Sequence, residues 1–400
     1  MDLELGSEYE AFRQEVAAFL AAHWPPAKET DARAAASAFR ERAVARGYLY
    51  RSIPKAYGGS EQAPDPLKGR VIREEFARVG APGELQGPGV SMLVPTLLAC
   101  GADWQKERFV APTLRGEIVW CQGYSEPGAG SDLASLRTRG ALEGESWVIS
   151  GQKVWTTMAH LADYMFILVR TEPDAAKHDG ISYLLLDMKQ PGVTVRPLKQ
   201  MTGGREFNEV FLDGARTPKD WIVGERGRGW QVSRTTLKHE RDTVGGQSRT
   251  EDMFGKLVEL AKDAQREGQP ALASGDVRQE LARIEAYVLA QRYSAYRQMS
   301  MDLAGQDAGL IGVLNKLNGT MIGHHIANLA QDLIGDAALL MPPQGRGGNR
   351  RGDEKWVNQI MGSLGVAIAG GASNIQRNVI AERGLGLPRD GAEGQKGTGA

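Results

Sequence analysis

The sequence predicts an α+β protein in three parts: an N-terminal helical domain, a middle antiparallel β-barrel and a C-terminal four-helix bundle. Apolar residues recur at helical spacing through the first part and again after Gly227, whereas short segments rich in β-branched and aromatic residues fill the middle. We therefore expect domains over residues 1–118, 119–226 and 227–390, followed by a glycine-rich, flexible tail over 391–400.

Composition limits the class of protein. The 400 residues are 42% hydrophobic, and 48 lysine and arginine residues nearly cancel 49 aspartate and glutamate residues, so no long-range field favours nucleic acid or an anionic membrane. The two cysteines, Cys100 and Cys121, match no metal-ligand spacing and make no disulfide framework. The acidic N-terminus lacks the apolar core of a signal peptide, and no apolar run reaches membrane-spanning length. We expect a cytoplasmic protein that binds neither nucleic acid nor membrane.

The first part is predicted to consist of helices joined by loops. Phe12, Val16 and Phe19 lie at helical spacing, and Pro25 and Pro26 end that helix. No cluster of histidines or carboxylates suggests chemistry here, so we expect this part to be scaffold. Further helices are expected from near Thr30 to Gly47, at Val71–Val79 and at Gln105–Leu114.

The middle part consists of short predicted strands, separated by turns such as that at His178-Asp-Gly. Several strands at close spacing are typical of an antiparallel barrel or sandwich, and the flanking helices can cover both faces of the sheet. The predicted strands are Glu117–Tyr124, Trp147–Ser150, Tyr164–Val169, Ile181–Asp187, Val193–Pro197 and Phe207–Leu212.

The third part returns to helix. Long apolar-periodic segments with short connections favour an antiparallel bundle. The exception is Met341–Asp353, whose prolines, glycines and arginines predict an exposed loop. The predicted helices cover about 229–264, 276–304, 308–334 and 354–369, with a last one over 374–383.

Two motifs in the middle part suggest a ligand site. Tyr124–Asp132 reads Y-S-E-P-G-A-G-S-D, and its glycines let the backbone approach an anionic or carbonyl-rich partner. Gly151–Thr157 reads G-Q-K-V-W-T-T, and residues two apart on an extended strand share a face, so Trp155 and Thr157 can meet one planar heteroaromatic ligand. A surface turn followed by a strand with a core tryptophan explains the spacing equally well.

One predicted helix places a carboxylate on an apolar stripe. Glu240 lies between Leu237 and Val244 at helical spacing, on a face that is expected to pack inward. Burial raises the pKa of a carboxyl group, which is how a general base near neutral pH is made. The alternative is a structural ion pair with Arg241 or with a lysine of the bundle. The complete stripe is Trp230, Ser233, Leu237, Glu240 and Val244.

The last helix follows a pair of glycines. Gly370 and Gly371 are expected to end one helix before the next begins. The free N–H groups at the start of the next helix suit a phosphate or thioester oxygen. Ser373 and Gln376 have the spacing of a capping box. A simple turn between two helices is an equally good interpretation.

Five motifs occur in a fixed order along nearly the whole chain, as far as Arg389. They are Y-S-E-P-G-A-G-S-D, G-Q-K-V-W-T-T, F-N-E-V-F-L-D, G-x-G-W and G-A-S-N-I-Q-R-N-x-I-A-E-R-x-L-G-L-P-R. This set resembles the acyl-CoA dehydrogenase family. The resemblance implies the three-part fold above, with FAD between barrel and bundle, an acyl-CoA substrate, and an electron-transfer flavoprotein as the electron acceptor.

Carried over by position, the resemblance implies a cofactor site. Trp155 is expected to lie against the flavin and Thr157 to hydrogen-bond near its N5, while Ser125 stands where the family usually has threonine. Ser131 is also expected to contact the pantetheine arm of the substrate. The complete expected set of flavin contacts is Gln122, Tyr124, Ser125, Gly130, Ser131, Trp155 and Thr157.

The resemblance also implies the reaction. A base removes the α-proton of the thioester, the β-hydrogen leaves as hydride to flavin N5, and the product is the trans-2-enoyl-CoA. Many members carry the base just before a turn glycine, but that position is Gly370 here, whose N–H can still contact the thioester carbonyl. Other members, including those for branched or steroid-derived chains, carry a glutamate before an arginine on the first bundle helix. Glu240 and Arg241 match this pattern, so we expect Glu240 to be the base and Arg241 to contact substrate or to stabilise this helix.

Three departures from the family pattern concern the part of the flavin site built by a neighbouring subunit. Thr250–Gly255 lacks the arginine of R-x-x-F-G, Ile334–Ala337 retains little of G-G-x-G, and the turn threonine is Ala372. We therefore expect a homo- or hetero-oligomer, in which a paralogous chain is a candidate for completing the site. Two other functions stay open: a flavin-dependent acyl-CoA oxidase, and a partner subunit that only completes another chain's site.

Overall fold

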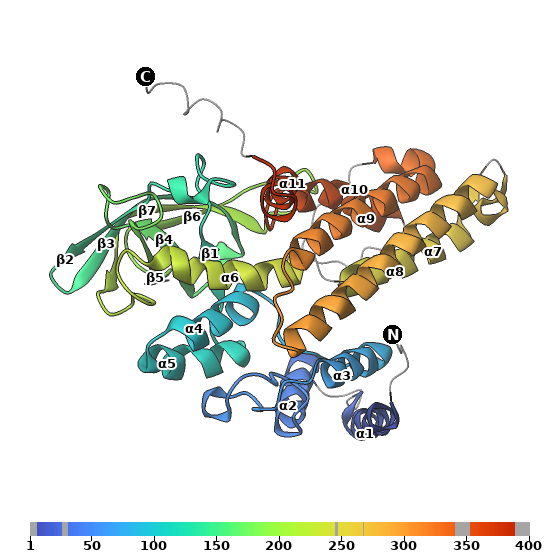
Figure 1. The fold of residues 1–400 in the computed structure, drawn as a ribbon, viewed down its shortest axis with the longest axis horizontal. Coiled ribbons are helices and arrows are strands. Elements are labelled where there is room, and N and C mark those ends of the chain that lie inside the picture. Colours follow the sequence, from blue (N-terminus) through green and yellow to red (C-terminus); the bar gives the residue numbers. More distant parts are fainter. Residues whose placement is uncertain (1–5, 26–30, 245–246, 267, 341–352, 389–400) are drawn as a thin grey trace.

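The chain forms three parts in sequence order: N-terminal helices, a curled sheet and C-terminal helices (Figure 1). The predicted architecture is confirmed. Residues 341–352 of the predicted loop and the predicted tail over 391–400 lie outside the described residues. The computed structural model describes residues 6–25, 31–244, 247–266, 268–340 and 353–388, with side chains except those of 238–244, 247–248, 302–303 and 353–354.

The N-terminal helices agree with the predictions, with one addition. Residues 89–100 also form helix, as a π-helical turn over 89–93 followed by an α-helix over 94–100, and Pro95 lies in the first turn of the α-helix, where proline is favoured. The elements are α1 (Ser7–His23), α2 (Ala32–Ala45), η1 (Lys55–Tyr57), α3 (Pro66–Val79), η2 (Gly89–Leu93), α4 (Val94–Cys100) and α5 (Asp103–Leu114).

The middle part is one seven-stranded sheet that curls around a core of its own. The sheet is mixed rather than antiparallel throughout, because β4 pairs in parallel with β1 and with β2. The order is β1-β4-β2-β3-β7-β6, with β5 paired to β4. The strands are β1 (Trp120–Gly123), β2 (Arg139–Glu143), β3 (Ser146–Thr157), β4 (Tyr164–Arg170), β5 (Ile181–Asp187), β6 (Val193–Pro197) and β7 (Phe207–Pro218).

Strand β4 is buried on both faces. Phe166 and Leu168 pack into the core shared with the N-terminal helices, whereas Met165 and Ile167 belong to the core inside the curl. A strand covered on both sides has an unbroken apolar sequence, which is what β4 shows.

The C-terminal helices form a bundle that reaches the sheet through α6. Helix α6 packs against β5, α4 and η2 at one end and against α9 at the other. A Cβ on Gly229 would lie 2.4 Å from the carbonyl carbon of Ser182, so glycine lets α6 start directly on the sheet. None of the described helices is long and apolar enough to cross a membrane. The elements are α6 (Gly229–Val244), α7 (Gln247–Asp263), β8 (Gln265–Arg266), β9 (Gln269–Pro270), η5 (Ala271–Ala273), α8 (Gly275–Leu303), α9 (Ile311–Ile334), η6 (Gly335–Leu339), α10 (Asp353–Val366), α11 (Ser373–Val379) and η7 (Ile380–Gly384).

Candidate functional site

The two motifs of the middle part lie side by side after β1. Two consecutive carbonyl groups of the first motif are held by two consecutive residues of β3. Lys153 Nζ donates to the carbonyl of Tyr124 at 3.1 Å, and the Val154 N–H donates to that of Ser125 at 2.9 Å. Tyr124 and Ser125, two of the predicted flavin contacts, therefore lie beside the strand that carries the second motif.

Trp155 lies in a β-bulge and not on a regular extended strand, so the prediction of local geometry is wrong. The register of β3 on β7 shifts between Lys153 and Thr156, and Trp155 has a φ of 60°, in the left-handed region that side chains disfavour. The indole is 61% exposed, with the Phe207 ring edge-on at 6.1 Å between centroids. Trp155 is thus not a core tryptophan, and the bulge presents a large flat ring beside the half-buried Thr157.

The glycine-rich turn of the first motif is open on its outer side. Two backbone hydrogen bonds of 3.0 and 3.1 Å join Glu126 and Ala129 across the turn. Gly130 and Ser131, which follow, are exposed. Within the described residues, no heavy atom lies within 4 Å of the position of a Cβ on Gly130. The backbone of this turn is therefore accessible to a ligand.

A buried ion pair under the two motifs was missed by sequence reasoning. Lys153 is 0% exposed and donates to Glu126 Oε1 at 2.8 Å. Burial lowers the pKa of Lys153 to about 8. Burial favours the neutral form of Glu126, but Lys153 and neighbouring donors hold the pKa of this carboxyl below its ordinary range. A signal was available: Lys153 continues the inward alternation of Trp147 and Ile149, so period-two spacing predicts a buried lysine that needs a partner.

Helix α6 carries the predicted base. Ser233 and Thr236 are fully buried, and Thr236 shares a 2.9 Å hydrogen bond with Thr96 of α4. Position 240 follows Thr236 by one helical turn, so the backbone puts Glu240 on the same face of α6. The side chains of Glu240 and Arg241 lie outside the described part of the structure.

The turn before α11 holds Gly370 at a φ of 63°. Its carbonyl lies 3.5 Å from the side-chain nitrogen of Gln376, which donates to it. The predicted capping box is wrong: the helix begins at Ser373 with Ala372 as N-cap, and the Ser373 hydroxyl donates back to the carbonyl of Ala367. The reason is that Ser373 lies one residue inside the helix, so its hydroxyl is not at the N-cap position that a capping box requires.

The predicted site residues fall on two parts of the fold. One group lies in β1, in the segment after it and in β3. The other lies on α6 and in the turn between α10 and α11. Figure 1 shows α6 running from the sheet toward α9, against which α11 packs. The first group is Gln122, Tyr124, Ser125, Gly130, Ser131, Trp155 and Thr157, and the second is Glu240, Arg241 and Gly370.

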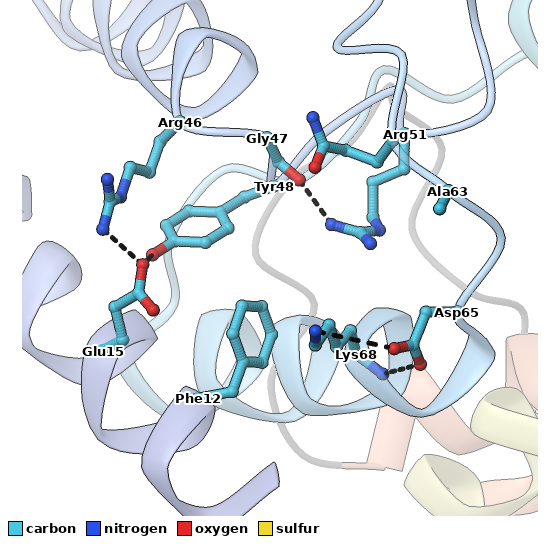
Figure 2. Close-up of a pocket in the computed structure, with 10 residues that line it drawn as sticks. Phe12, Glu15, Arg46, Gly47, Tyr48, Arg51, Ala63, Asp65 and Lys68 are labelled. Atoms are coloured by element: carbon cyan, nitrogen blue, oxygen red, sulfur yellow. Dashed lines mark hydrogen bonds and ion pairs between the residues drawn. The ribbon is translucent and has the colours of Figure 1, made fainter. Parts of the chain in front are cut away.

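A separate hollow of about 270 Å³ lies among the N-terminal helices (Figure 2). Glu15 accepts hydrogen bonds from Arg46 and from the Tyr48 hydroxyl, and Arg51 donates to the Gly47 carbonyl at 2.7 Å. None of the predicted site residues lines this hollow. The polar groups drawn there pair mainly with one another, so it does not compete with the motifs as the candidate site.

A curled sheet lies between two helical parts and carries an exposed indole and an open glycine-rich turn, so the chain is a three-part protein with a candidate site for a flat ligand. Family models match all three parts: the acyl-CoA dehydrogenase N-terminal domain over residues 6–117, the middle domain over 121–215 and the C-terminal domain over 227–385. The chain therefore belongs to the acyl-CoA dehydrogenase family of oxidoreductases. Members of this family are flavoproteins.

Individual relatives agree with this assignment. The chain is 39% identical over 372 residues to acyl-CoA dehydrogenase IpdE1 of Mycobacterium tuberculosis, covering 91% of each chain. It is similar to the solved structure of the Tcur3481-Tcur3483 steroid ACAD, with a TM-score of 0.77, 29% identity, and coverage of 98% of this chain and 100% of that one. The ChsE4-ChsE5 complex from Mycobacterium tuberculosis gives a TM-score of 0.77 at 27% identity, with coverage of 97% and 100%.

The residues present fit a flavin. Trp155 offers a flat ring at the surface, Thr157 a hydroxyl two residues away, and the open turn at Gly130 a backbone without bulk. Such a set suits an aromatic ring system joined to a pyrophosphate.

Proposed function

We propose that this chain catalyses the FAD-dependent α,β-dehydrogenation of an acyl-CoA thioester to the trans-2-enoyl-CoA, with Glu240 as the base. Glu240 removes the α-proton, and the N–H of Gly370 stabilises the negative charge that develops on the thioester oxygen. Arg241 contacts the substrate or holds α6 in place. When bound, FAD supplies the acceptor for the β-hydrogen, which leaves as hydride to N5.

The observation that carries the proposal is the bulge at Trp155. A residue with a side chain in the left-handed region costs about 1–3 kcal/mol, and such residues cluster at functional sites. Here the bulge exposes the indole next to Ser125 and close to Thr157 in the chain. This supports a flavin ring against Trp155, with its pyrophosphate along Gly130 and Ser131.

Replacement of Glu240 tests the base. Glu240→Gln keeps the size of the side chain but cannot accept a proton, so we expect turnover to fall by about 10²–10⁴-fold while FAD stays bound. The measurement is flavin reduction by acyl-CoA in a stopped-flow spectrometer without oxygen. Glu259→Gln, an exposed position on α7, is the matched control. If Glu240→Gln leaves the complex fully active, this chain only completes a partner's site.

We propose bulky, branched or steroid-derived acyl chains as the substrate class. One solved relative is described as a steroid ACAD, and members with the base on the first bundle helix include such enzymes. A panel of acyl-CoAs of varied length and branching, read by flavin bleaching without oxygen, tests this. Faster bleaching by straight short chains than by bulky ones contradicts it.

We propose an electron-transfer flavoprotein as the acceptor and the cytoplasm as the location. Both cysteines are free thiols, in keeping with a reducing compartment. The competing function is an acyl-CoA oxidase, which passes its electrons to oxygen. Stopped-flow reoxidation of the reduced flavin in air separates the two: slow return supports the dehydrogenase, and fast return supports the oxidase.

We also propose that a paralogous chain completes the site in a hetero-oligomer. Glu251 stands at the arginine position of R-x-x-F-G, three residues before Phe254, and accepts a hydrogen bond from Arg292 of its own bundle at 2.6 Å. Ala372, at the turn-threonine position, offers no hydroxyl. One solved relative is named as a complex of two chains, ChsE4-ChsE5. A homotetramer of the pure chain with one FAD per subunit contradicts this proposal.

A further inference from the structure

The buried pair Lys153–Glu126 takes no part in the proton and hydride transfers proposed above, yet it lies directly under the proposed flavin site. Lys153 is 0% and Glu126 9% exposed, and Nζ to Oε1 is 2.8 Å. The same ammonium donates to the Tyr124 carbonyl at 3.1 Å. The pair therefore joins the middle of β3 to the segment that follows β1.

Glu126 connects a third segment to this point. Its two carboxylate oxygens accept the N–H groups of Arg137 at 2.7 Å and Thr138 at 2.9 Å, just before β2. Three donor groups thus make four hydrogen bonds here, three to the carboxylate of Glu126 and one to the carbonyl of Tyr124, two residues before it. Such a network fixes the backbone of the first motif in one position.

The position of the pair relative to the bulge is specific. Lys153 and Val154 hold the two consecutive carbonyls, and Trp155 follows at once in the left-handed conformation. The last regular pairing of β3 with β7 before the shift is that of Lys153 with Val210. The ion pair therefore sits where β3 stops being regular and the bulge begins.

Stability alone is a weak reason for such a pair. Desolvation of two charges offsets much of their attraction, and well-packed apolar residues of similar volume stabilise a core equally well or better. An apolar residue at position 153 cannot donate to the Tyr124 carbonyl, however, and so cannot hold the first motif against the bulge.

We propose that Lys153 and Glu126 are positioning residues of the flavin site, which set the Tyr124–Ser125 backbone against the Trp155 bulge and thereby fix the flavin plane and its redox properties. This inference rests on the proposed function, because it requires FAD at this face.

The test is the double variant Lys153→Met/Glu126→Gln, which removes both charges and leaves no lone buried ion. We expect FAD to bind at least tenfold more weakly. We also expect the midpoint potential of the bound flavin to shift by about 30 mV, which equals a tenfold change in the ratio of its affinities for oxidised and reduced flavin. Arg13→Met/Glu75→Gln, a partly buried pair between α1 and α3, is the control and should leave both readouts unchanged.

Wild-type affinity and potential in the folded double variant would overturn the inference. If that variant does not fold, Lys153→Arg decides, because it keeps the charge but alters the geometry. A shifted potential with flavin retained supports positioning, whereas an unchanged affinity and potential with only a lower melting temperature contradicts it. Failure of the proposed function is distinct: the wild-type chain then binds no FAD either alone or with its partner chain, or its flavin is not reduced by any acyl-CoA.

Discussion

Among single residues, Trp155 shows how a local backbone conformation determines what a side chain can contact. On a regular strand the alternation of Trp147, Ile149 and Lys153 would turn residue 155 into the core. The bulge inserts one residue, so Thr156 takes the inward place and the indole points outward. The sequence supplies the ring, and the register on β7 decides where it points.

Substitution of Trp155 should separate cofactor binding from stability. Trp155→Gly removes the exposed ring and relieves the left-handed conformation, so we expect the free energy of unfolding of the apoprotein to change by no more than about 1 kcal/mol. We expect FAD affinity to fall at least about tenfold, since one aromatic contact contributes about 0.5–1.5 kcal/mol beyond its buried area. Urea denaturation and FAD titration measure the two effects.

Trp155→Phe is the control, because it keeps an aromatic face and should bind FAD better than Trp155→Gly. Equal FAD affinity in wild type and Trp155→Gly would show that the indole does not touch the flavin.

At the residue scale, the sequence singled out residues of the two motifs but did not predict the backbone conformation that places them. Spacing singled out Trp155 and Thr157, and the motifs singled out Ser125 beside them. The bulge could not be predicted, because a register shift depends on a partner strand some fifty residues away in the chain. Lys153 was missed because its partner, Glu126, becomes a neighbour only when β3 meets the first motif.

On the scale of secondary-structure elements, the contact of α1 with α3 includes a cluster of ion pairs. Arg13 of α1 donates to Glu75 at 3.0 Å and to Glu74 at 2.8 Å, and Arg78 donates to Glu75 at 2.8 Å. Burial raises the pKa of Glu75, but its hydrogen bonds with Arg13 and Arg78 outweigh this and hold the pKa below its ordinary 4.5. The carboxylate form therefore stabilises the fold.

The ion-pair cluster around Glu75 predicts that the free energy of unfolding depends on pH. A carboxyl with a depressed pKa stabilises the protein above its unfolded pKa of about 4.5 and loses that contribution as pH falls through the folded pKa. We expect Glu75→Gln to destabilise the protein by about 1–3 kcal/mol at pH 7. The difference from wild type should shrink toward pH 3. Urea denaturation at both pH values, followed by circular dichroism, measures it, and a difference that is independent of pH contradicts the prediction.

Most elements were predictable because their periodicity is local. The helices after residue 274 and six of the strands match the predicted positions to within a few residues, apart from the extension of β3 and β7. The single helix predicted over 229–264 is wrong, because this stretch forms two helices, α6 and α7. Strand β2 was not predictable, since its residues R-G-A-L-E have little strand propensity. Its extended conformation depends instead on its pairing with β3. The parallel pairings of β4 depend on strand order, which alternation in one segment does not encode.

On the scale of the whole molecule, the C-terminal end carries most of the strongly exposed apolar side chains among the described residues. Ile368 is 73% and Leu385 69% exposed. Apolar surface of this kind marks an interaction face. Others nearby in the chain are Leu339, Leu340, Leu364 and Leu387.

This face predicts the oligomeric state. We expect Ile368→Arg combined with Leu385→Arg to lower the sedimentation coefficient to that of a smaller assembly and to reduce FAD content, because each charge would be buried at the contact. Leu142→Arg, on β2, should leave the assembly intact. Sedimentation velocity with the chain alone, and with a candidate partner chain, makes the comparison. An assembly unaffected by the double variant places the contact elsewhere.

The order of the three parts could be predicted as a whole, because the five motifs fix it. How Glu240 and Gly370 lie relative to the sheet could not be predicted, since the placement of α6 and of the turn before α11 depends on packing across the bundle.

The exposure of Trp155 has a practical consequence. All eight tryptophans belong to the described residues, and Trp155 alone among them is exposed. Indoles shielded by protein emit at shorter wavelengths and escape dissolved quenchers, so acrylamide should act chiefly on the emission of this one residue. The protein therefore contains an intrinsic fluorescent reporter at the face where the cofactor is proposed to bind. Binding of FAD can be followed by the fluorescence of Trp155, without any added label.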